Sequence, residues 1–158
     1  MAKERDTIQD FYELSVNEIM DKRLPLIEKD ASIERVFSLL TLNNHIWIVE
    51  SKGSKKLVGI ITEHDILDIC SPRKKNSYFG LPDKKSLHFE SFEKAGHIMS
   101  RNPIRCSQDE KVKDVLDKMI VHRIKRIPVV ESEEITGEIT LHLLIRTFYA
   151  LIRTSNEG

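Results

Sequence analysis

The segment Gly59-Ile60-Ile61-Thr62-Glu63-His64-Asp65 occurs again, 78 positions later, as Gly137-Glu138-Ile139-Thr140-Leu141-His142-Leu143. Working outward, Ile46-Trp47-Ile48-Val49-Glu50 matches Ile127-Pro128-Val129-Val130-Glu131, and Val16-Asn17-Glu18-Ile19-Met20 matches Ala95-Gly96-His97-Ile98-Met99. Because the matches keep their order and nearly their spacing, the chain contains two copies of one supersecondary unit. The copies differ where Asp65 of the first is replaced by Leu143.

Length and charge limit the possible architectures and partners. A chain of 158 residues has the size of one ordinary domain. Two halves of about 60 residues would each be marginally stable alone, so we expect one body in which each copy covers the apolar face of the other. Lys plus Arg and Asp plus Glu both total 25. The overall charge therefore favours neither nucleic acid nor an anionic membrane.

The cysteines and the N-terminal residues indicate the cellular compartment to expect. Cys70 and Cys106 lack the Cys-x-x-Cys spacing of a zinc ribbon or redox dithiol, and they do not suggest a secreted disulfide scaffold. Residues 1–6 lack the apolar core of a signal peptide, and no apolar run approaches about 18 residues. We expect a soluble cytoplasmic protein without a membrane association. No convincing set of metal ligands is present, and no metal is expected.

Hydrophobic periodicity predicts the elements of each copy. Residues 33–42 have a helical stripe that Asp30 or Ser32 can cap, and Ser107-Gln108-Asp109-Glu110 has the form of a capping box before Val112. Two β-branched runs joined by a polar turn then predict adjacent strands, at 46–49 and 57–61 and again at 127–130 and 135–139. A last helix begins at Thr62 or Thr140. Each copy is therefore a strand or extended segment, a helix, two strands and a helix.

The chain divides into five segments. Residues 1–15 form an N-terminal segment, 16–70 the first copy, 94–152 the second copy and 153–158 a tail. Residues 71–93 contain Pro72, Gly80 and two basic clusters, a composition typical of an exposed linker. No helix-turn-helix or aromatic-interleaved basic stretch accompanies these clusters, so nucleic-acid binding is not expected.

Both copies resemble the CBS motif, named for cystathionine β-synthase. The resemblance rests on an Ile-Met pair, a Ser/Thr-Ile/Val helix, a Pro-Val-Val-like strand and Gly-x-Ile-Thr-x-x-Asp before the last helix. It implies an α/β fold in which two β-α-β-β-α motifs pack about a pseudo-twofold axis into one module with two clefts. It also implies binding of an adenosine-containing ligand, such as AMP, ADP, ATP or S-adenosylmethionine, and regulation of a partner rather than catalysis.

The residues around Thr62 predict the working cleft. A strand that feeds a helix here presents backbone N–H groups and a helix dipole to a phosphate. The Thr62 hydroxyl can donate to phosphate, and the Asp65 carboxylate can accept from the ribose hydroxyls. The resemblance implies the same roles. However, Thr62 and Asp65 also form an ordinary capping box, and Gly59 suits either close approach to a ligand or tight strand packing.

We expect further residues to contact the adenine base and the phosphates of the ligand. By the resemblance, adenine lies against the extended segment at Pro25 and Leu26 and against apolar walls at Ile60 and Ile61. Lys125 and Arg126 stand directly before the second Pro-Val-Val-like strand. The gamma subunit of AMP-activated protein kinase, which this chain resembles at the level of the module, has a basic pair there that reaches phosphates. The alternative is a solvated basic patch with Arg123.

The second cleft lacks the ribose acceptor. It would be opened by Thr140, with His45 and Ile104 beside it, but Leu143 stands where the first copy has Asp65. We therefore expect this cleft to be degenerate or suited to a different ligand.

The predicted function is regulatory. The chain has no phosphate-binding P-loop, dinucleotide fingerprint, His-Glu-x-x-His or Gly-x-Ser-x-Gly motif, so an enzyme is not expected and an adenine nucleotide is expected as a regulatory ligand rather than a cofactor. Trp47 and an apolar face on the last helix predict a homodimer that signals to an unidentified regulated protein. Trp47 could instead be core, and the residues around Phe11 could instead cover that helix. The alternatives are a structural dimerisation module with no ligand and a subunit that completes an enzyme's regulatory region.

Overall fold

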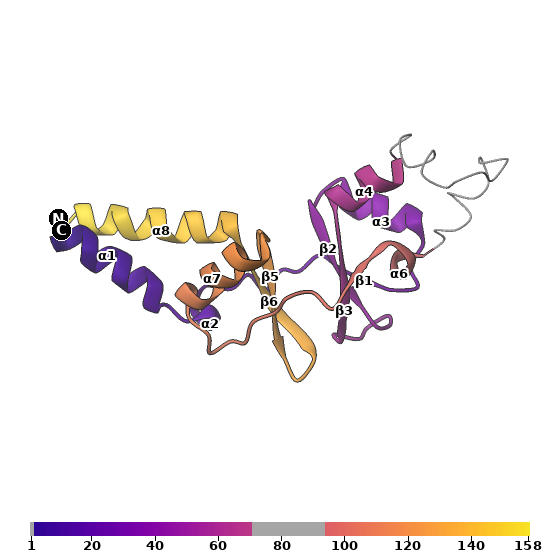
Figure 1. The fold of residues 1–158 in the computed structure, drawn as a ribbon, viewed down its shortest axis with the longest axis horizontal. Helices are drawn as coiled ribbons and strands as arrows, with labels where there is room; N and C mark the ends of the chain where they lie inside the picture. Colours follow the sequence, from indigo (N-terminus) through magenta and orange to yellow (C-terminus); the bar gives the residue numbers. More distant parts are fainter. Residues whose placement is uncertain (1, 71–93) are drawn as a thin grey trace. The chain divides into compact units, whose positions relative to one another are not determined.

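A computed structural model describes residues 2–70 and 94–158 and shows a mixed α/β protein (Figure 1). The chain forms two compact units, one made of Met1–Leu24 with Ile104–Gly158 and the other of Pro25–Pro103. None of the helices in the described ranges combines the length and apolar character needed to cross a membrane.

The unit Pro25–Pro103 is built on a four-stranded sheet with the order β1-β2-β3-β4. β1 (Leu26–Glu28) is parallel to β2 (His45–Val49), and β3 (Leu57–Thr62) is antiparallel both to β2 and to β4 (Ser100–Arg101). The helices among the described residues of this unit are α3 (Ile33–Leu40), α4 (Glu63–Cys70) and α6 (Ala95–Ile98). The core of this unit contains Ile27, Ala31, Val36, Ile46, Ile48, Ile61 and Ala95.

The other unit contains an antiparallel pair of strands, β5 (Arg126–Glu131) and β6 (Glu134–Thr140). Four helices belong to it: α1 (Ala2–Glu13), α2 (Val16–Ile19), α7 (Val112–His122) and α8 (Leu141–Asn156). Its core includes Phe11, Val16, Val112, Val115, Ile127, Val129, Ile139 and Leu144. The four strands predicted from the two copies and the helix predicted from Ile33 are confirmed, although α3 ends at Leu40.

Each unit combines parts of both sequence copies. Asp21, which follows α2 of the first copy, exchanges two backbone hydrogen bonds of 3.0 and 2.9 Å with Glu138 on β6 of the second. Correspondingly, Ser100, which follows α6 of the second copy, pairs with Ile60 on β3 of the first. The copies predicted from sequence and the compact units of the structure are thus different divisions of the chain.

A glycine permits each of these close approaches. A Cβ atom added at Gly59 would lie 2.5 Å from the sulfur of Met99 and 2.9 Å from the carbonyl oxygen of Ser100. At Gly137 the corresponding distances are 2.6 Å to the sulfur of Met20 and 3.1 Å to the carbonyl oxygen of Asp21. The methionine at the end of each copy's leading segment therefore occupies the space left by the glycine of the other copy. Tight strand packing, one of the two roles considered for Gly59, is present.

Of the two predicted helix caps, the one at Ser32 is confirmed and the one at Ser107 is wrong. The Ser32 hydroxyl accepts from the backbone N–H of Arg35 at 3.3 Å, as expected for the N-cap of α3. The Glu110 carboxylate does accept from the backbone N–H of Ser107, at 2.7 Å, but α7 begins only at Val112. Its N-cap is Lys111, whose backbone N–H donates to Asp114 at 3.1 Å. The Ser-x-x-Glu pattern therefore closes the turn before the helix.

The N-terminal segment forms a helix, α1, that lies antiparallel against α8 (Figure 1). The rings of Phe11 and Phe148 are 5.0 Å apart between centroids, and the hydroxyls of Thr7 and Ser155 are 2.8 Å apart. Hydrogen bonds from the ammonium groups of Lys111 and Lys113 lower the pKa of Glu13 to about 2. The N-terminal segment thus covers one face of α8, as the alternative from sequence proposed.

Trp47 lies in the core. Its side chain has no exposed surface, and its indole meets the His45 ring edge-on with 5.5 Å between centroids. The prediction that Trp47 is an interface residue is wrong, because β2 is buried along its whole length and leaves no face for a partner.

We expect Gly59→Ala to lower the free energy of unfolding by about 1–3 kcal/mol, the usual cost of overpacking. The added methyl meets a backbone oxygen that cannot swing aside as the Met99 side chain can. Urea unfolding followed by circular dichroism measures the free energy of unfolding of the variant and the parent. Gly137→Ala is the matched control and should destabilise less, because its nearest backbone oxygen is farther away. Equal stability of parent and Gly59→Ala would contradict the packing role.

Candidate functional site

The predicted pair Thr62 and Asp65 meets where β3 ends and α4 begins. The backbone N–H of Thr62 donates to Oδ2 of Asp65 at 2.7 Å, and the Thr62 hydroxyl donates to the same oxygen at 3.1 Å. The carboxylate therefore caps α4, which is the alternative that the sequence left open. Both bonds end on Oδ2, and within the described part of the chain Oδ1 takes no hydrogen bond. Capping leaves one carboxylate oxygen for a ligand.

The neighbouring strand supports this turn. His45 is the cross-strand partner of Thr62, and the backbone N–H of Glu63 donates to the carbonyl of Asn44 at 3.2 Å. His45 is buried, with Nδ1 2.8 Å from the side-chain oxygen of Asn44. The structure therefore places His45, predicted for the second cleft, directly beside the Thr62 of the first.

The residues predicted to contact the base divide between two faces of the sheet. Leu26, Trp47 and Ile60 lie side by side across β1, β2 and β3, and Leu26 and Ile60 are half-buried. Pro25 is held next to them, since its carbonyl accepts from the backbone N–H of Trp47 at 2.8 Å. Ile61 points to the opposite face and is completely buried in the core. Leu26 and Ile60 thus share one apolar face, and Ile61 lies behind it.

The other predicted residues lie in the other compact unit. Arg126 on β5 is the cross-strand partner of Thr140, and the carbonyl of Lys125 accepts from the backbone N–H of Leu141 at 2.8 Å. The Thr140 hydroxyl caps α8 by accepting from the backbone N–H of Leu143 at 3.0 Å. Ile104 is half-buried in the same unit. The start of α8 thus repeats the backbone arrangement at the start of α4, with a hydroxyl cap in place of the carboxylate.

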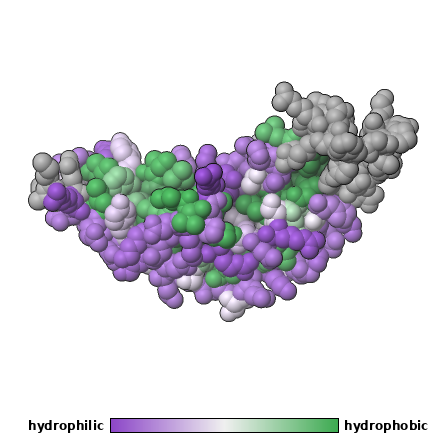
Figure 2. Space-filling view, in the orientation of Figure 1, coloured by the Kyte–Doolittle hydropathy of each residue, from purple (hydrophilic) through white to green (hydrophobic). Residues whose placement is uncertain are grey.

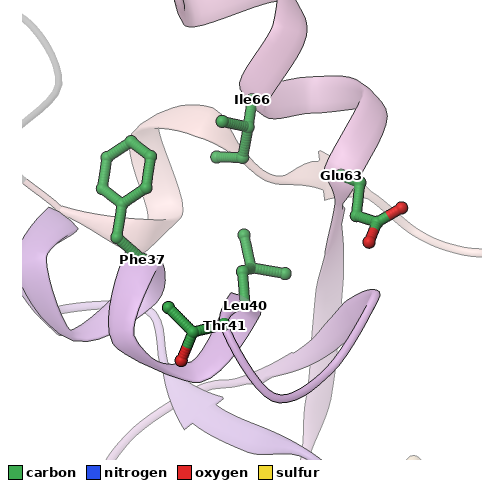
Figure 3. Close-up of a pocket in the computed structure, with 5 residues that line it drawn as sticks. All are labelled: Phe37, Leu40, Thr41, Glu63 and Ile66. Atoms are coloured by element: carbon green, nitrogen blue, oxygen red, sulfur yellow. The ribbon is translucent and has the colours of Figure 1, made fainter.

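A pocket that sequence reasoning missed lies between α3 and α4. It has a volume of about 240 Å³ and is lined by Phe37, Leu40, Thr41, Glu63 and Ile66. Figure 3 shows the Phe37, Leu40 and Ile66 side chains directed into it and the Glu63 carboxylate at its edge. It includes neither Thr62 nor Asp65. The helical stripe of α3 was the available signal, but such a stripe also describes an ordinary core face.

The remaining groups that could take part in chemistry are possible metal ligands and the Cys106 thiol. The described residues contain no group of three His, Cys, Asp or Glu side chains that could hold a metal ion. Burial raises the pKa of the Cys106 thiol to about 12. This thiol therefore stays protonated at neutral pH and is a poor nucleophile.

The CBS domain family model matches residues 16–71 and 95–149. The chain is similar to the uncharacterized protein YlbB of Bacillus subtilis, with 30% identity over 95 residues, 60% of this chain and 53% of YlbB. It therefore spans about half the length of that relative.

Two solved structures share the fold. The CBS domain pair of MJ0100, in complex with 5′-methylthioadenosine and S-adenosyl-L-methionine, superimposes with a TM-score of 0.67 and 28% identity over 87% of this chain and 98% of that one. CBSX2 of Arabidopsis thaliana, in complex with AMP, has a TM-score of 0.71 and 17% identity over 87% of this chain and 97% of that one. With two family matches that together cover more than half of its residues, the chain belongs to the CBS domain family.

Proposed function

We propose that this protein is a regulatory module that binds an adenosine-containing ligand and signals its occupancy to an unidentified protein. The observation that carries the proposal is the half-buried Asp65 carboxylate, fixed through one oxygen by Thr62. Such a carboxylate suits the paired hydroxyls of a ribose, because it accepts hydrogen bonds without first having to be ordered. The adenosine compounds bound to the CBS pairs of MJ0100 and CBSX2 support the ligand class.

The proposed ligand site extends from Asp65 along the sheet. Leu26 and Ile60 form an apolar surface for the adenine ring, with Pro25 beside them. Gly59 and Ile61 shape the strand behind this surface. Lys125 and Arg126 are proposed to supply positive charge to the phosphates. The second site, with Thr140, His45 and Ile104, has no carboxylate at the position of Leu143, so we propose that it does not bind the same ligand.

The same proposal covers assembly and location. We propose a non-catalytic homodimer in which dimerisation and ligand binding are separate properties. Free thiols at both Cys70 and Cys106 fit a reducing cytoplasm. A structural dimerisation module without a ligand is the competing function, and a titration distinguishes the two.

An adenine nucleotide should raise the melting temperature. A ligand that binds only the native state adds about 2.7 kcal/mol at 100 times its dissociation constant. For a domain of this size that is roughly 5–11 °C, at about 2–4 °C per kcal/mol. Differential scanning fluorimetry with AMP, ATP, NADH and S-adenosylmethionine measures the shift. The absence of a shift with every compound at millimolar concentration would favour the structural module.

Asp65→Asn should weaken binding by about 10- to 150-fold, the equivalent of losing about 1.5–3 kcal/mol of hydrogen bonding to a charged group. The amide oxygen can still accept from Thr62 and cap α4, whereas the amide nitrogen cannot accept from ribose. Isothermal titration calorimetry measures the affinity, and thermal unfolding should show a nearly unchanged fold. Thr140→Ala is the matched control and should bind as the parent does. If only Thr140→Ala loses affinity, the ligand occupies the other site.

Arg126→Ala should weaken ATP binding more than adenosine binding, because the removed interaction is between a charge and phosphate. The difference between the two ligands should shrink as salt rises. Titrations with ATP and adenosine at two ionic strengths test this. An equal loss for both ligands would mean that Arg126 supports the fold of β5 rather than the phosphates.

A further inference from the structure

The helix α1 is attached to its unit through a few side chains. Among its described side chains, residues 5–13, only Thr7 and Phe11 are buried, and they lie one helical turn apart on the same face. The Phe11 ring meets the Phe148 ring of α8, and the Thr7 hydroxyl pairs with the hydroxyl of Ser155. Anchors with this spacing are typical of an amphipathic helix that binds to the surface of another protein.

A charge contact holds the C-terminal end of α1. The Glu13 carboxylate accepts hydrogen bonds from the ammonium groups of Lys111 and Lys113, the latter at 2.9 Å. All three side chains remain partly exposed, so the contact fixes the register of α1 more than it stabilises the unit. We call the surface of the unit that α1 covers, which includes Phe148, Ser155, Lys111 and Lys113, the α1-binding face.

The backbone hydrogen bonds that anchor the N-terminal segment to α7 begin after α1 ends. The backbone N–H of Val112 donates to the carbonyl of Leu14 at 2.9 Å, and that of Val16 donates to the carbonyl of Glu110 at 2.8 Å. These bonds would stay in place if α1 came away. A helix of 12 residues is only marginally stable by itself in water, so α1 depends on the α1-binding face for its helical state. Release and unfolding of α1 would therefore be one local event.

The apolar surface of α8 extends beyond the part that α1 covers. Ile145, Tyr149 and Ile152 are 57%, 61% and 37% exposed, and their spacing of i, i+4 and i+7 places them in one stripe. Figure 2 shows hydrophobic surface over α8. The stripe lies about a quarter turn from Phe148. A helix with more apolar side chains than α1 could therefore bury the stripe together with Phe148, and it would gain binding energy that α1 does not provide.

We propose that the α1-binding face is the docking site for an amphipathic helix of the regulated protein, and that α1 occupies this face until that helix replaces it. The partner helix has an aromatic side chain at the position of Phe11 and a carboxylate two residues later, opposite Lys111 and Lys113. It also has apolar side chains that reach the exposed stripe of α8. Because α1 is tethered and therefore has a high effective concentration, the partner helix must bind better than α1 does. The contact of α1 with its own unit is thus autoinhibitory.

This proposal deepens the proposed function, since it names the kind of segment through which the regulated protein is recognised. It rests on that function only for the existence of such a protein. All of the residues concerned belong to the compact unit formed by Met1–Leu24 and Ile104–Gly158. The displacement of α1 can therefore be measured without a nucleotide.

Hydrogen exchange of the full chain, followed by NMR, tests whether α1 opens locally. The amides of α1 should exchange at least about tenfold faster than those of β5 and β6. Phe11→Ala should increase the exchange rates in α1 by at least about tenfold more, because it removes the largest anchor. Ile8→Ala is the matched control, since Ile8 is 39% exposed on the same helix. Equal protection of α1 and the two strands would overturn the proposal, because α1 would then open only with the whole unit.

A fluorescent peptide with the sequence of residues 2–13 is the probe for the docking helix. It should bind the Phe11→Ala chain at least about tenfold more tightly than the Ile8→Ala chain, because only the first has lost the anchor of its own α1. The same peptide carrying Phe11→Ala should not bind. Fluorescence anisotropy measures these affinities. Equal binding by the two chains, or no binding by the Phe11→Ala chain, would overturn the proposal.

A second variant keeps the peptide test decisive if Phe11→Ala does not fold. Glu13→Lys leaves the core intact and should also increase peptide binding, because it removes the charge contact of α1 but keeps Lys111 and Lys113 for the peptide. Asp10→Lys is its control, because it makes the same change of charge at an exposed position of α1. Peptide binding that rises equally in both variants would show a general effect of charge and would contradict the proposed contact.

The mass of the chain distinguishes a partner helix from the α1 of a second copy. Sedimentation equilibrium should give the same mass for the parent and for Phe11→Ala. A parent with twice the 18.3 kDa of one chain that Phe11→Ala converts to monomers would mean that two copies exchange α1, and it would overturn the proposal. Nucleotide titration of the same samples reports separately on the ligand site. Opening of α1 without nucleotide binding would contradict only the proposed function, and nucleotide binding without opening of α1 would contradict only the docking of a partner helix.

Discussion

The close backbone approach at Gly59 and Gly137 is the constraint on which both units depend. At each glycine, the strand of one copy meets the methionine and the following backbone of the other copy's leading segment. A side chain at either position would fill the space that Met99 or Met20 occupies. Since Gly59 meets Ser100 and Gly137 meets Asp21, neither copy supplies a complete unit from its own residues.

This constraint also positions the candidate ligand site. β3 pairs with β4 at Gly59 and Ile60 and with β2 as far as Thr62, so backbone hydrogen bonds fix the strand up to the turn into α4. The turn into α4 is then closed by Asp65, which accepts from the backbone and the hydroxyl of Thr62. In the proposed site, one oxygen of the Asp65 carboxylate caps α4 and the other is proposed to bind the ligand, so the same group would have a structural and a binding role. Asp65→Ala would confound these roles, whereas Asp65→Asn separates them.

The two copies share one backbone arrangement but differ in the side chains at corresponding positions. Ile60 corresponds to the buried Glu138, Glu63 to Leu141 and Asp65 to Leu143. The start of α4 is consequently acidic, whereas the first turn of α8 has no acidic residue. The basic pair Lys125 and Arg126 lies at the start of β5, where Arg126 is the cross-strand partner of Thr140. The replacement of Asp65 by Leu143 underlies the proposal that only one of the two sites binds the ligand.

The elements with local signals could be predicted from the amino-acid sequence. Period-two and helical patterns predicted the four long strands and α3, and the three-residue spacing of Thr62 and Asp65 was enough to bring them together, because one helical turn joins them. The distant segment that covers each apolar face is visible only in the folded chain. Contacts between residues far apart in the chain produce four features that no local pattern predicts. These are the pairing of each copy's leading segment with the other copy, the burial of Trp47, the packing of α1 on α8 and the pocket beside Glu63. A periodic pattern indicates that one face of a helix or strand is buried. It does not indicate which segment covers that face, because this depends on packing between distant parts of the chain.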